Sequence, residues 1–405
     1  MDFRASYRGS KKISLGIRIP SNSEAGGVCQ YAQSMVESVY AVEKDFHFDI
    51  SIVYEIDSTS ASKNFPCLPK CIDNKTIITF SKSRSLDRRL MSLISLFGPS
   101  KILNKYLFSK IELLEGFDFF LVPYIETIPH LFLGKPFIFT LHDLQEKHFP
   151  YFFSAKERFL RQLANRILCL KAKHILCESH FVKNDIIENF QVQPDKITVC
   201  QAPPLKLYDL NLINPANFDQ VRKRYNIKLP YIFYPAQFWP HKNHINLLEA
   251  FKRISLKYSD LTLVLCGAEL SAASTVRKKI KQLDLESKVL LLGYVPDEDL
   301  PYLYKMSLFL IMPSLYESIS IPIYEAFSLE VPVCASNTGA IPQQVGGAAL
   351  LFQPKNIEDI YSKIKILLED KNKRESLAKM GKRRLDQLNH KNFGAHILRL
   401  IEQCL

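Results

Sequence analysis

The stretch that decides the fold reads Leu308-Phe-Leu-Ile-Met-Pro-Ser-Leu-Tyr-Glu-Ser-Ile-Ser-Ile-Pro-Ile-Tyr-Glu325. Its leading apolar run is typical of a buried strand, and Pro322 suits an early position in a helix. Glu317 is therefore expected on the loop at the carboxyl end of the strand, and Glu325 within the helix. Ligands of open α/β sheets bind at this edge, where a helix start favours anions. Two carboxylates there suit a ligand with hydroxyls and phosphates, although one capping and one solvated glutamate would give the same spacing.

Short apolar runs alternate with longer amphipathic segments over the whole chain. This pattern is typical of βαβ units on parallel sheets. The predicted strands are Ile13–Ile19, Phe48–Val53, Thr76–Phe80, Phe119–Val122, Phe137–Leu141, His174–Cys177, Ile197–Cys200, Tyr231–Tyr234, Leu261–Cys266, Val289–Leu292, Leu308–Met312, Val331–Ala335 and Ala349–Phe352. The longer predicted helices are Val28–Val42, Lys156–Lys173, Asn243–Lys257, Ile357–Leu368, Lys371–Leu388 and Asn392–Leu405. So many strands indicate an α/β protein with two Rossmann-like doubly wound parallel-sheet domains.

A break in this alternation divides the chain. Gln201–Leu229 contains Pro203-Pro204 and Asn214-Pro215 and shows weak periodicity, which indicates a linker. The predicted parts are a domain at 1–203, a linker at 204–229, a domain at 230–388, and a terminal helix at 389–405 that can pack back on the first domain or against the second. Two sheets facing each other across a hinge would direct their carboxyl ends at one cleft, the default position of an active site.

Composition limits the class of protein. With 405 residues, 47% of them hydrophobic and 23% charged, the chain is globular and long enough for two or three domains. Its start is polar, without an apolar segment of signal-peptide length, and no apolar run approaches the roughly 20 residues that cross a bilayer. Nine cysteines are scattered without a C-x-x-C pair, which favours reduced thiols and a cytoplasmic location.

The formal net charge of +12 is spread over both halves but is dense between Lys82 and Lys110. The basic residues there flank the near-helical apolar stretch Leu90–Phe97. Such a segment can lie on the anionic inner face of a membrane. A helix with one side in the core and a solvated basic side is a slightly simpler explanation. No nucleic-acid-binding motif accompanies the charge, so nucleic acid is not an expected partner.

Several loops at predicted carboxyl ends of strands carry residues suited to a ligand. Gly26-Gly27 would let backbone amides approach a phosphate or sugar closely, with a plain connecting turn as the alternative. His142-Asp143 could bind sugar hydroxyls or move a proton, with a capping Asp143 and an exposed His142 as the alternative. Lys242, directly before a helix, could hold a diphosphate, although a single lysine alone would be taken as a surface charge. Gly267 and Gly293–Pro296 follow further strands of the second half, and together these loops favour a nucleotide pocket.

These residues together resemble the GT-B glycosyltransferases, and among them the large retaining family 4. The E-x7-E signature of that family is matched by Glu317 and Glu325. Two further family patterns are matched by Lys242-Asn-His-Ile-Asn-Leu-Leu-Glu-Ala-Phe251 and by Pro332-Val-Cys-Ala-Ser-Asn-Thr-Gly339. The N-terminal Gly-Gly and His-Asp pairs are matched by Gly26-Gly27 and His142-Asp143. The match is dense over the second half and thinner over the first, as expected if the first half reads the acceptor.

The resemblance implies transfer of a hexose from a UDP- or GDP-linked sugar to a saccharide or lipid-linked acceptor, with retention of anomeric configuration. The process would be surface polysaccharide or lipopolysaccharide-type biosynthesis, and neither a metal nor another cofactor is expected. Lys242 would stabilise charge on the diphosphate, Glu317 would hold the sugar, and Glu325 would bind the ribose. His142 would position the acceptor or the transferred sugar. The remaining donor-site residues would be Gln237, Gly267, Tyr294, Val295, Ser318, Ser320 and Ile321, and a phosphate and acceptor loop would contain Gly26, Gly27 and Asp143.

The sequence departs from the family pattern in three places, one of them a tripeptide. The usual Arg before the Lys is Gln237, the usual Gly-Phe-Gly after the first Glu is Ser318-Ile-Ser320, and the usual Glu after the late Pro is Gln343. Loss of the Arg removes a cation from the diphosphate site and leaves more of the phosphate binding to Lys242. Because of Gln237 and Gln343, a non-catalytic nucleotide-sugar binding protein stays open as an alternative. A GT-B-like sugar-nucleotide epimerase, which shares the two-domain cleft and would need no acceptor, is a second alternative.

Overall fold

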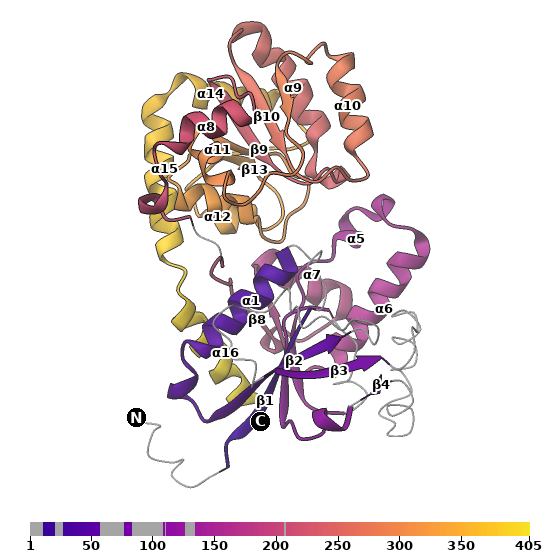
Figure 1. The fold of residues 1–405 in the computed structure, drawn as a ribbon. Helices are drawn as coiled ribbons and strands as arrows, with labels where there is room; N and C mark the ends of the chain where they lie inside the picture. Colours follow the sequence, from indigo (N-terminus) through magenta and orange to yellow (C-terminus); the bar gives the residue numbers. More distant parts are fainter. Residues whose placement is uncertain are drawn as a thin grey trace. The chain divides into compact units, whose positions relative to one another are not determined.

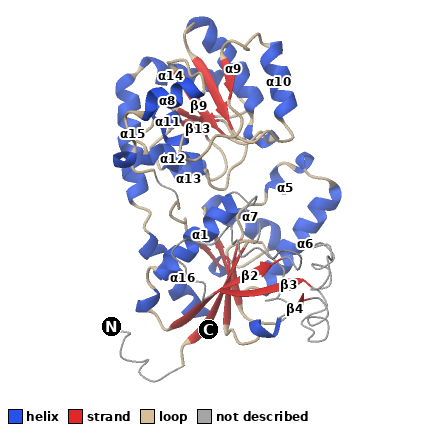
Figure 2. Cartoon of the chain, viewed as in Figure 1, coloured by secondary structure: helices blue, strands red, loops and turns tan. Residues whose placement is uncertain are grey.

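The computed structural model describes residues 11–20, 27–56, 77–82, 108–109, 111–125, 134–205 and 208–405. The chain forms two compact units, one of residues 1–205 with 388–405 and one of residues 206–387. In each unit, helices cover a mostly parallel sheet (Figures 1 and 2). The prediction of two doubly wound α/β folds is confirmed.

The first unit is built on an eight-stranded sheet in the order β4-β3-β2-β1-β5-β6-β7-β8. The strands are β1 (Ile13–Ile19), β2 (Phe48–Ile56), β3 (Ile77–Lys82), β4 (Phe108–Ser109), β5 (Phe119–Val122), β6 (Phe137–Thr140), β7 (His174–Cys177) and β8 (Ile197–Val199). Leu15 of the central strand β1 lies opposite Ile50 of β2 and Phe119 of β5 in parallel register. Only β4 among these strands runs antiparallel, and it was not predicted because two residues are too short to show a period.

Helices cover both faces of this sheet. In the described part of this unit they are α1 (Gly27–Tyr40), η3 (Glu43–Asp45), η6 (Ile111–Leu114), α5 (Gln145–His148), η7 (Pro150–Phe152), α6 (Ala155–Lys171), α7 (His180–Phe190), η8 (Pro194–Lys196) and α16 (His390–Cys404). On one face α1 and α16 lie side by side and bury Met35, Val39 and Ile397 together (Figure 1). The other face buries apolar residues of α6 and α7, including Leu168 and Val182. The last helix of the chain therefore belongs to the first unit.

The second unit is built on a six-stranded parallel sheet in the order β11-β10-β9-β12-β13-β14. Its strands are β9 (Tyr231–Pro235), β10 (Thr262–Cys266), β11 (Val289–Leu291), β12 (Leu310–Met312), β13 (Val333–Ser336) and β14 (Leu350–Phe352). Its helices are η9 (Leu210–Leu212), α8 (Asn217–Arg224), η10 (Pro240–Lys242), α9 (His244–Lys257), α10 (Ala273–Gln282), α11 (Leu300–Met306), α12 (Ile321–Ser328), α13 (Ile341–Val345), α14 (Ile357–Glu369) and α15 (Lys371–Asp386). Every strand lies at or within two residues of a predicted one, because each is a short apolar run.

The stretch predicted as a linker at 204–229 contains a helix. α8 packs on α11, where Asn217 Nδ2 donates to the hydroxyl of Tyr302 at 3.1 Å and Arg224 pairs with Asp299 at 2.6 Å. This helix buries Val221 alone of its eight residues, so its apolar periodicity is too weak to recognise in the sequence. From Lys206 onward the stretch is part of the second unit.

Two sequence predictions fall outside the described residues, namely Gly26 and nearly all of the basic stretch at 82–110. Among the described helices, none is long and apolar enough to cross a membrane. Cys29 is disulfide-bonded, which departs from the prediction of reduced thiols throughout, whereas Cys169, Cys177, Cys200, Cys266, Cys334 and Cys404 are free.

Candidate functional site

Glu317 and Glu325 lie where the sequence predicts them, at the carboxyl edge of the second sheet. β12 ends at Met312, a loop follows, and α12 begins at Ile321 with Pro322 in its first turn. Both glutamates are buried, with exposed fractions of 8% and 9%. Because a buried carboxylate requires compensating donors or charges, their partners determine what they can bind.

Lys242 is the ionic partner of Glu317. It ends η10, separated from the start of α9 by Asn243 alone, and its Nζ lies 2.6 Å from Glu317 Oε1. The backbone supports this contact, because Leu315 N donates to the carbonyl of His241 at 2.8 Å and so joins the two loops. The pair offers a cation suited to a phosphate oxygen next to an acceptor suited to a hydroxyl.

The backbone that carries Lys242 is fixed by buried hydrogen bonds. Asn243 adopts the left-handed backbone conformation, with φ at 58°. Its side-chain Nδ2 donates to the carbonyls of Pro313 at 2.9 Å and Pro354 at 2.8 Å. The hydroxyl of Tyr234 donates to the carbonyl of Lys242 at 2.7 Å. Lys242 is thus held by β9 and by two other loops of the same edge.

Glu325 has a different partner, the hydroxyl of Tyr304 on α11. This hydroxyl donates to Glu325 Oε2 at 2.6 Å from a fully buried ring. Burial, together with the charge of Glu325, holds the pKa of Tyr304 well above its usual value, so its hydroxyl stays a donor. Burial and the same carboxylate also raise the pKa of the Cys266 thiol at the end of β10.

The loop between the two glutamates is held by residues around α13. Ala340 N donates to the carbonyl of Glu317 at 2.9 Å, and Gly339 has a φ of +56° with no room for a side chain beside that carbonyl. The fully buried Gln344 binds both backbone groups of Ser320, since it accepts from the N–H at 2.9 Å and donates to the carbonyl at 2.7 Å. The N–H of Ser320 is therefore committed to the protein, whereas its buried hydroxyl has no partner among the described residues.

The other predicted donor-site residues differ in accessibility. Gln237 is exposed, and its Oε1 accepts from the indole N–H of Trp239 at 3.1 Å. Gly267 has a φ of +144°, and a side chain there would overlap the carbonyl of Ala236. Tyr294 is 75% exposed, whereas Val295 is buried, so of these two only Tyr294 presents its side chain to solvent. The two remaining positions of the loop and helix start, Ser318 and Ile321, are half-buried.

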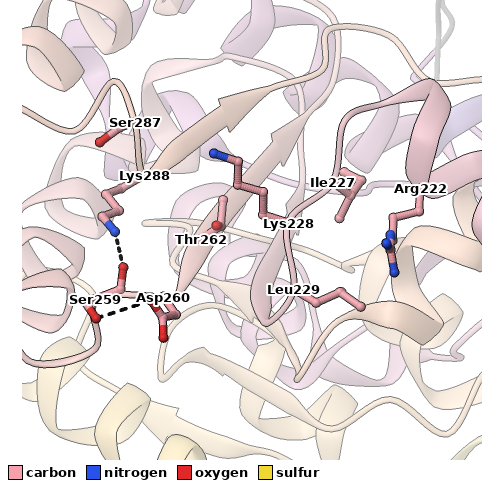
Figure 3. Close-up of a pocket in the computed structure, with 9 residues that line it drawn as sticks. All are labelled: Arg222, Ile227, Lys228, Leu229, Ser259, Asp260, Thr262, Ser287 and Lys288. Carbon is pink, nitrogen blue, oxygen red and sulfur yellow. Dashed lines mark hydrogen bonds between the residues drawn. The ribbon is translucent and has the colours of Figure 1, made fainter.

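A pocket of about 600 Å³ opens at the opposite, amino-terminal edge of this sheet (Figure 3). It is lined by Arg222, Ile227, Lys228, Leu229, Ser259, Asp260, Thr262, Ser287 and Lys288. Most of these residues lie just before β9, β10 and β11 or at the start of β10, and Lys288 donates to the carbonyl of Ser259. Since the strands are parallel, this pocket is separate from the edge that carries Lys242 and the glutamates.

In the first unit, His142 follows β6 at the carboxyl edge of the sheet. Its Nδ1 lies 3.2 Å from Oε2 of Glu178, and its Nε2 lies 2.9 Å from the carbonyl oxygen of Pro123. Tyr31 of α1 packs edge-on against the ring, with centroids 4.7 Å apart. Burial alone would lower the pKa of His142, but the hydrogen bond and charge of Glu178 raise it above the ordinary value.

The side chain of Asp143 binds the start of α5 and Arg161. Its Oδ1 accepts from the N–H of Gln145, the first residue of α5, and from Arg161, both at 3.2 Å. Asp143 therefore contacts the start of α5 without being its N-cap, which is Leu144, and the exposed His142 of the alternative is wrong, because its side chain is only 12% exposed. Gly27 is the exposed first residue of α1.

Comparison of the sequence with known proteins identifies the family of this chain. A family model described as Glycosyl transferases group 1 matches residues 217–384, and one described as Glycosyltransferase Family 4 matches residues 78–201. The O-antigen chain mannosyltransferase B of Escherichia coli is 30% identical over 256 residues, which cover 62% of this chain and 66% of that protein. The chain belongs to glycosyltransferase family 4.

A second relative of this family 4 protein is RfbU of Salmonella typhimurium, an O-antigen chain mannosyltransferase. It is 28% identical over 228 residues, which cover 56% of this chain and 59% of RfbU. The matched region spans less than two thirds of the length of either relative.

Solved structures show the fold of this family 4 protein. HepE of Anabaena, in complex with UDP and glucose, matches 96% of this chain and 100% of its own with a TM-score of 0.70 at 15% identity. Sucrose-phosphate synthase of Thermosynechococcus elongatus matches 97% of this chain and 99% of its own, with a TM-score of 0.69 at 17% identity. The GT-B fold class is confirmed.

Four residues hold the site of this family 4 protein without having been assigned a role from the sequence. They are Asn243, Tyr304, Gly339 and Gln344. Asn243 and Gly339 lie within matched family patterns, and both adopt a positive φ. Asn and Gly are the residue types that favour this conformation, so the sequence did carry a signal for these two positions. Tyr304 and Gln344 carry no such signal, because their partners are more than 20 residues away in sequence.

Proposed function

We propose that this protein transfers a hexose, expected to be mannose, from a UDP- or GDP-linked sugar to a saccharide or lipid-linked acceptor, with retention of anomeric configuration. The observation that carries the proposal is the 2.6 Å contact of Lys242 with Glu317 at the carboxyl edge of the second sheet. The names of the two O-antigen mannosyltransferase relatives support the sugar and a role in surface polysaccharide synthesis. Membership of family 4 supports transfer over the binding-protein and epimerase alternatives.

Each residue of the second unit has a distinct part in the proposed reaction. Lys242 stabilises the negative charge that develops on the diphosphate as the bond to the sugar breaks. Glu317 accepts hydrogen bonds from hydroxyls of the donor sugar, next to the same ammonium. Glu325 accepts from the ribose diol while Tyr304 holds its other side. The two carboxylates therefore act as hydrogen-bond acceptors and not as an acid–base pair.

The first unit is proposed to bind the acceptor, at the inner face of a membrane when the acceptor is lipid-linked. Gly27, His142 and Asp143 all follow strands of that unit, which supports a position for them at one edge. No divalent metal is needed in this proposal, so excess chelator is expected to leave the rate unchanged.

Replacement of Lys242 tests the proposal. We expect Lys242→Ala to lower kcat by about 10²- to 10³-fold, the loss typical when one stabilising group at a developing charge is removed. Lys257→Ala is the matched control, because Lys257 at the end of α9 also pairs with a glutamate, Glu369 at 3.2 Å, but at an exposed position. Transfer is measured with GDP-mannose and UDP-glucose against oligosaccharide and lipid-linked acceptors.

The outcomes separate the alternatives. Full activity of Lys242→Ala would contradict the phosphate role. Conversion of the sugar nucleotide without any acceptor would indicate an epimerase, and tight nucleotide binding without turnover over all donors and acceptors would indicate a binding protein. Nucleotide binding itself is followed by thermal shift, because a ligand of the native state raises its stability.

A further inference from the structure

The ring of His142 lies at the carboxyl ends of three neighbouring strands of the first unit. The residue itself follows β6, Glu178 follows β7, and Pro123 follows β5. One ring nitrogen faces the carboxylate at 3.2 Å and the other faces the carbonyl at 2.9 Å. The ring thus bridges the carboxyl ends of three adjacent strands, and both of its nitrogens are used for this purpose.

The nature of the two acceptors determines the protonation of the ring. A carbonyl oxygen can only accept, so Nε2 must carry a hydrogen. An ionised carboxylate likewise can only accept, so Nδ1 must carry one as well. A histidine that donates from both nitrogens is an imidazolium cation, and here its charge is balanced by Glu178, whose side chain is 5% exposed.

The described groups around the ring leave Glu178 as its main ionic partner. Tyr31 on α1 packs against the ring, and burial raises its pKa, so its phenol is neutral. Burial also raises the pKa of Cys177 and Cys200 beside Glu178 to about 12, so these thiols are neutral too. Asp143 adds negative charge that favours the cation, but its own contact is with Arg161.

We propose that Glu178 is a positioning residue that keeps His142 doubly protonated and fixes its ring across the ends of β5, β6 and β7. The inference rests on the proposed function, because these strand ends form the edge assigned to the acceptor. While both bonds stand, His142 can neither accept a proton from a substrate nor donate a hydrogen bond from either nitrogen to a sugar. It contributes a fixed positive charge and a fixed backbone to the site.

This arrangement has a defined pH dependence. The pKa of His142 in the folded state is raised above its unfolded value, mainly by Glu178 acting against burial. The stabilisation is therefore fully present below the unfolded pKa and is lost as the pH rises through the folded pKa. Deprotonation removes one of the two N–H donors and releases one strand end.

Nuclear magnetic resonance of histidine-labelled full-length protein tests the inference without substrate. In the wild type, the His142 ring is expected to keep both N–H groups above the pH at which free histidine loses one. Glu178→Gln keeps the shape of the side chain but removes its negative charge. In this variant the pH midpoint of the His142 titration is expected to fall. Glu188→Gln on the exposed side of α7 is the matched control, and His174, whose pKa burial lowers, should titrate unchanged in all three proteins.

Activity gives a second measurement. Glu178→Gln is expected to lose roughly ten- to hundredfold in kcat/KM for the acceptor at alkaline pH, as is typical of misplaced binding groups, with a much smaller loss at acid pH and an unchanged KM for the donor. A wild-type His142 that titrates like free histidine, or a folded Glu178→Gln protein whose His142 midpoint does not move, would overturn the inference. If the midpoint moves as expected but no donor and acceptor are turned over, the positioning role stands and the proposed function fails.

Discussion

Glu317 and Glu325 are about equally buried, but the side chains that contact them differ in kind. Glu317 is paired with Lys242, so the two together add little net charge to the edge of the sheet. Glu325 accepts a hydrogen bond from a neutral hydroxyl, that of Tyr304. Because this hydroxyl contacts Oε2, the contact is compatible with the ribose role proposed for Glu325.

At the level of this residue pair, Tyr304→Phe tests how much the hydroxyl supports Glu325. Its loss leaves a buried carboxylate without that donor, so the free energy of unfolding is expected to fall by about 1–3 kcal/mol. Tyr258→Phe is the matched control, because its hydroxyl also donates to a glutamate at 2.6 Å, but at an exposed position. Denaturant titration of both variants gives the comparison, and equal losses would show that burial of the carboxylate does not matter.

At the level of elements, the loop that carries Glu317 depends on its contact with the segment after β13. Gly339 has a positive φ and lies so close to the carbonyl of Glu317 that no side chain fits. The backbone contact between Ala340 and Glu317 thus fixes how far the loop extends from the sheet. The loop is shaped by a neighbouring connection as much as by its own residues.

Gly339→Ala is expected to displace this loop. Positive φ alone costs an alanine about 1–2 kcal/mol, and the overlap with Glu317 adds to that cost. Donor affinity is expected to fall together with stability, since Glu317 moves. Gly347→Ala is the control, because its φ is +86° but a side chain there meets nothing within 4 Å. Comparable donor affinities in the two variants, measured by calorimetry, would rule out the steric role of Gly339.

The sequence predicts elements far better than contacts. The strands were found because each is an apolar run, and Glu317 and Lys242 were placed at strand ends for the same reason. Their mutual contact spans 75 residues of sequence, and no local pattern encodes it. The same limit explains why Glu178 was missed as the partner of His142, 36 residues away, and why α8, with one buried residue, was read as a linker.

At the level of the whole molecule, the chain leaves the first unit after residue 205 and returns to it at residue 388. Its return is made by α16, whose Phe393, Ile397 and Ile401 share the apolar cluster that contains Met35 and Val39 of α1. Each unit has its own sheet, but the apolar cluster on one face of the first sheet includes these late residues.

Gly394→Ala tests this docking. The glycine lies against the carbonyl of Ser38 in α1, where a methyl group would overlap backbone atoms that cannot rotate away. The variant is expected to lower the melting temperature of the first unit by several degrees, since overpacking of a tight contact costs about 1–3 kcal/mol. Gly116→Ala in the same unit is the control, because a side chain there meets nothing within 4 Å. Equal calorimetric profiles of the two variants would contradict the prediction.

The position of α16 has a consequence for synthesis on the ribosome. Domains generally fold in the order in which they emerge, the N-terminal one first. Here the second unit, residues 206–387, can be complete while the first still lacks residues 388–405. Until those residues emerge, the apolar face of α1 stays uncovered on the nascent chain. The unit made first is therefore finished last, and this interval is when the growing polypeptide most needs a chaperone.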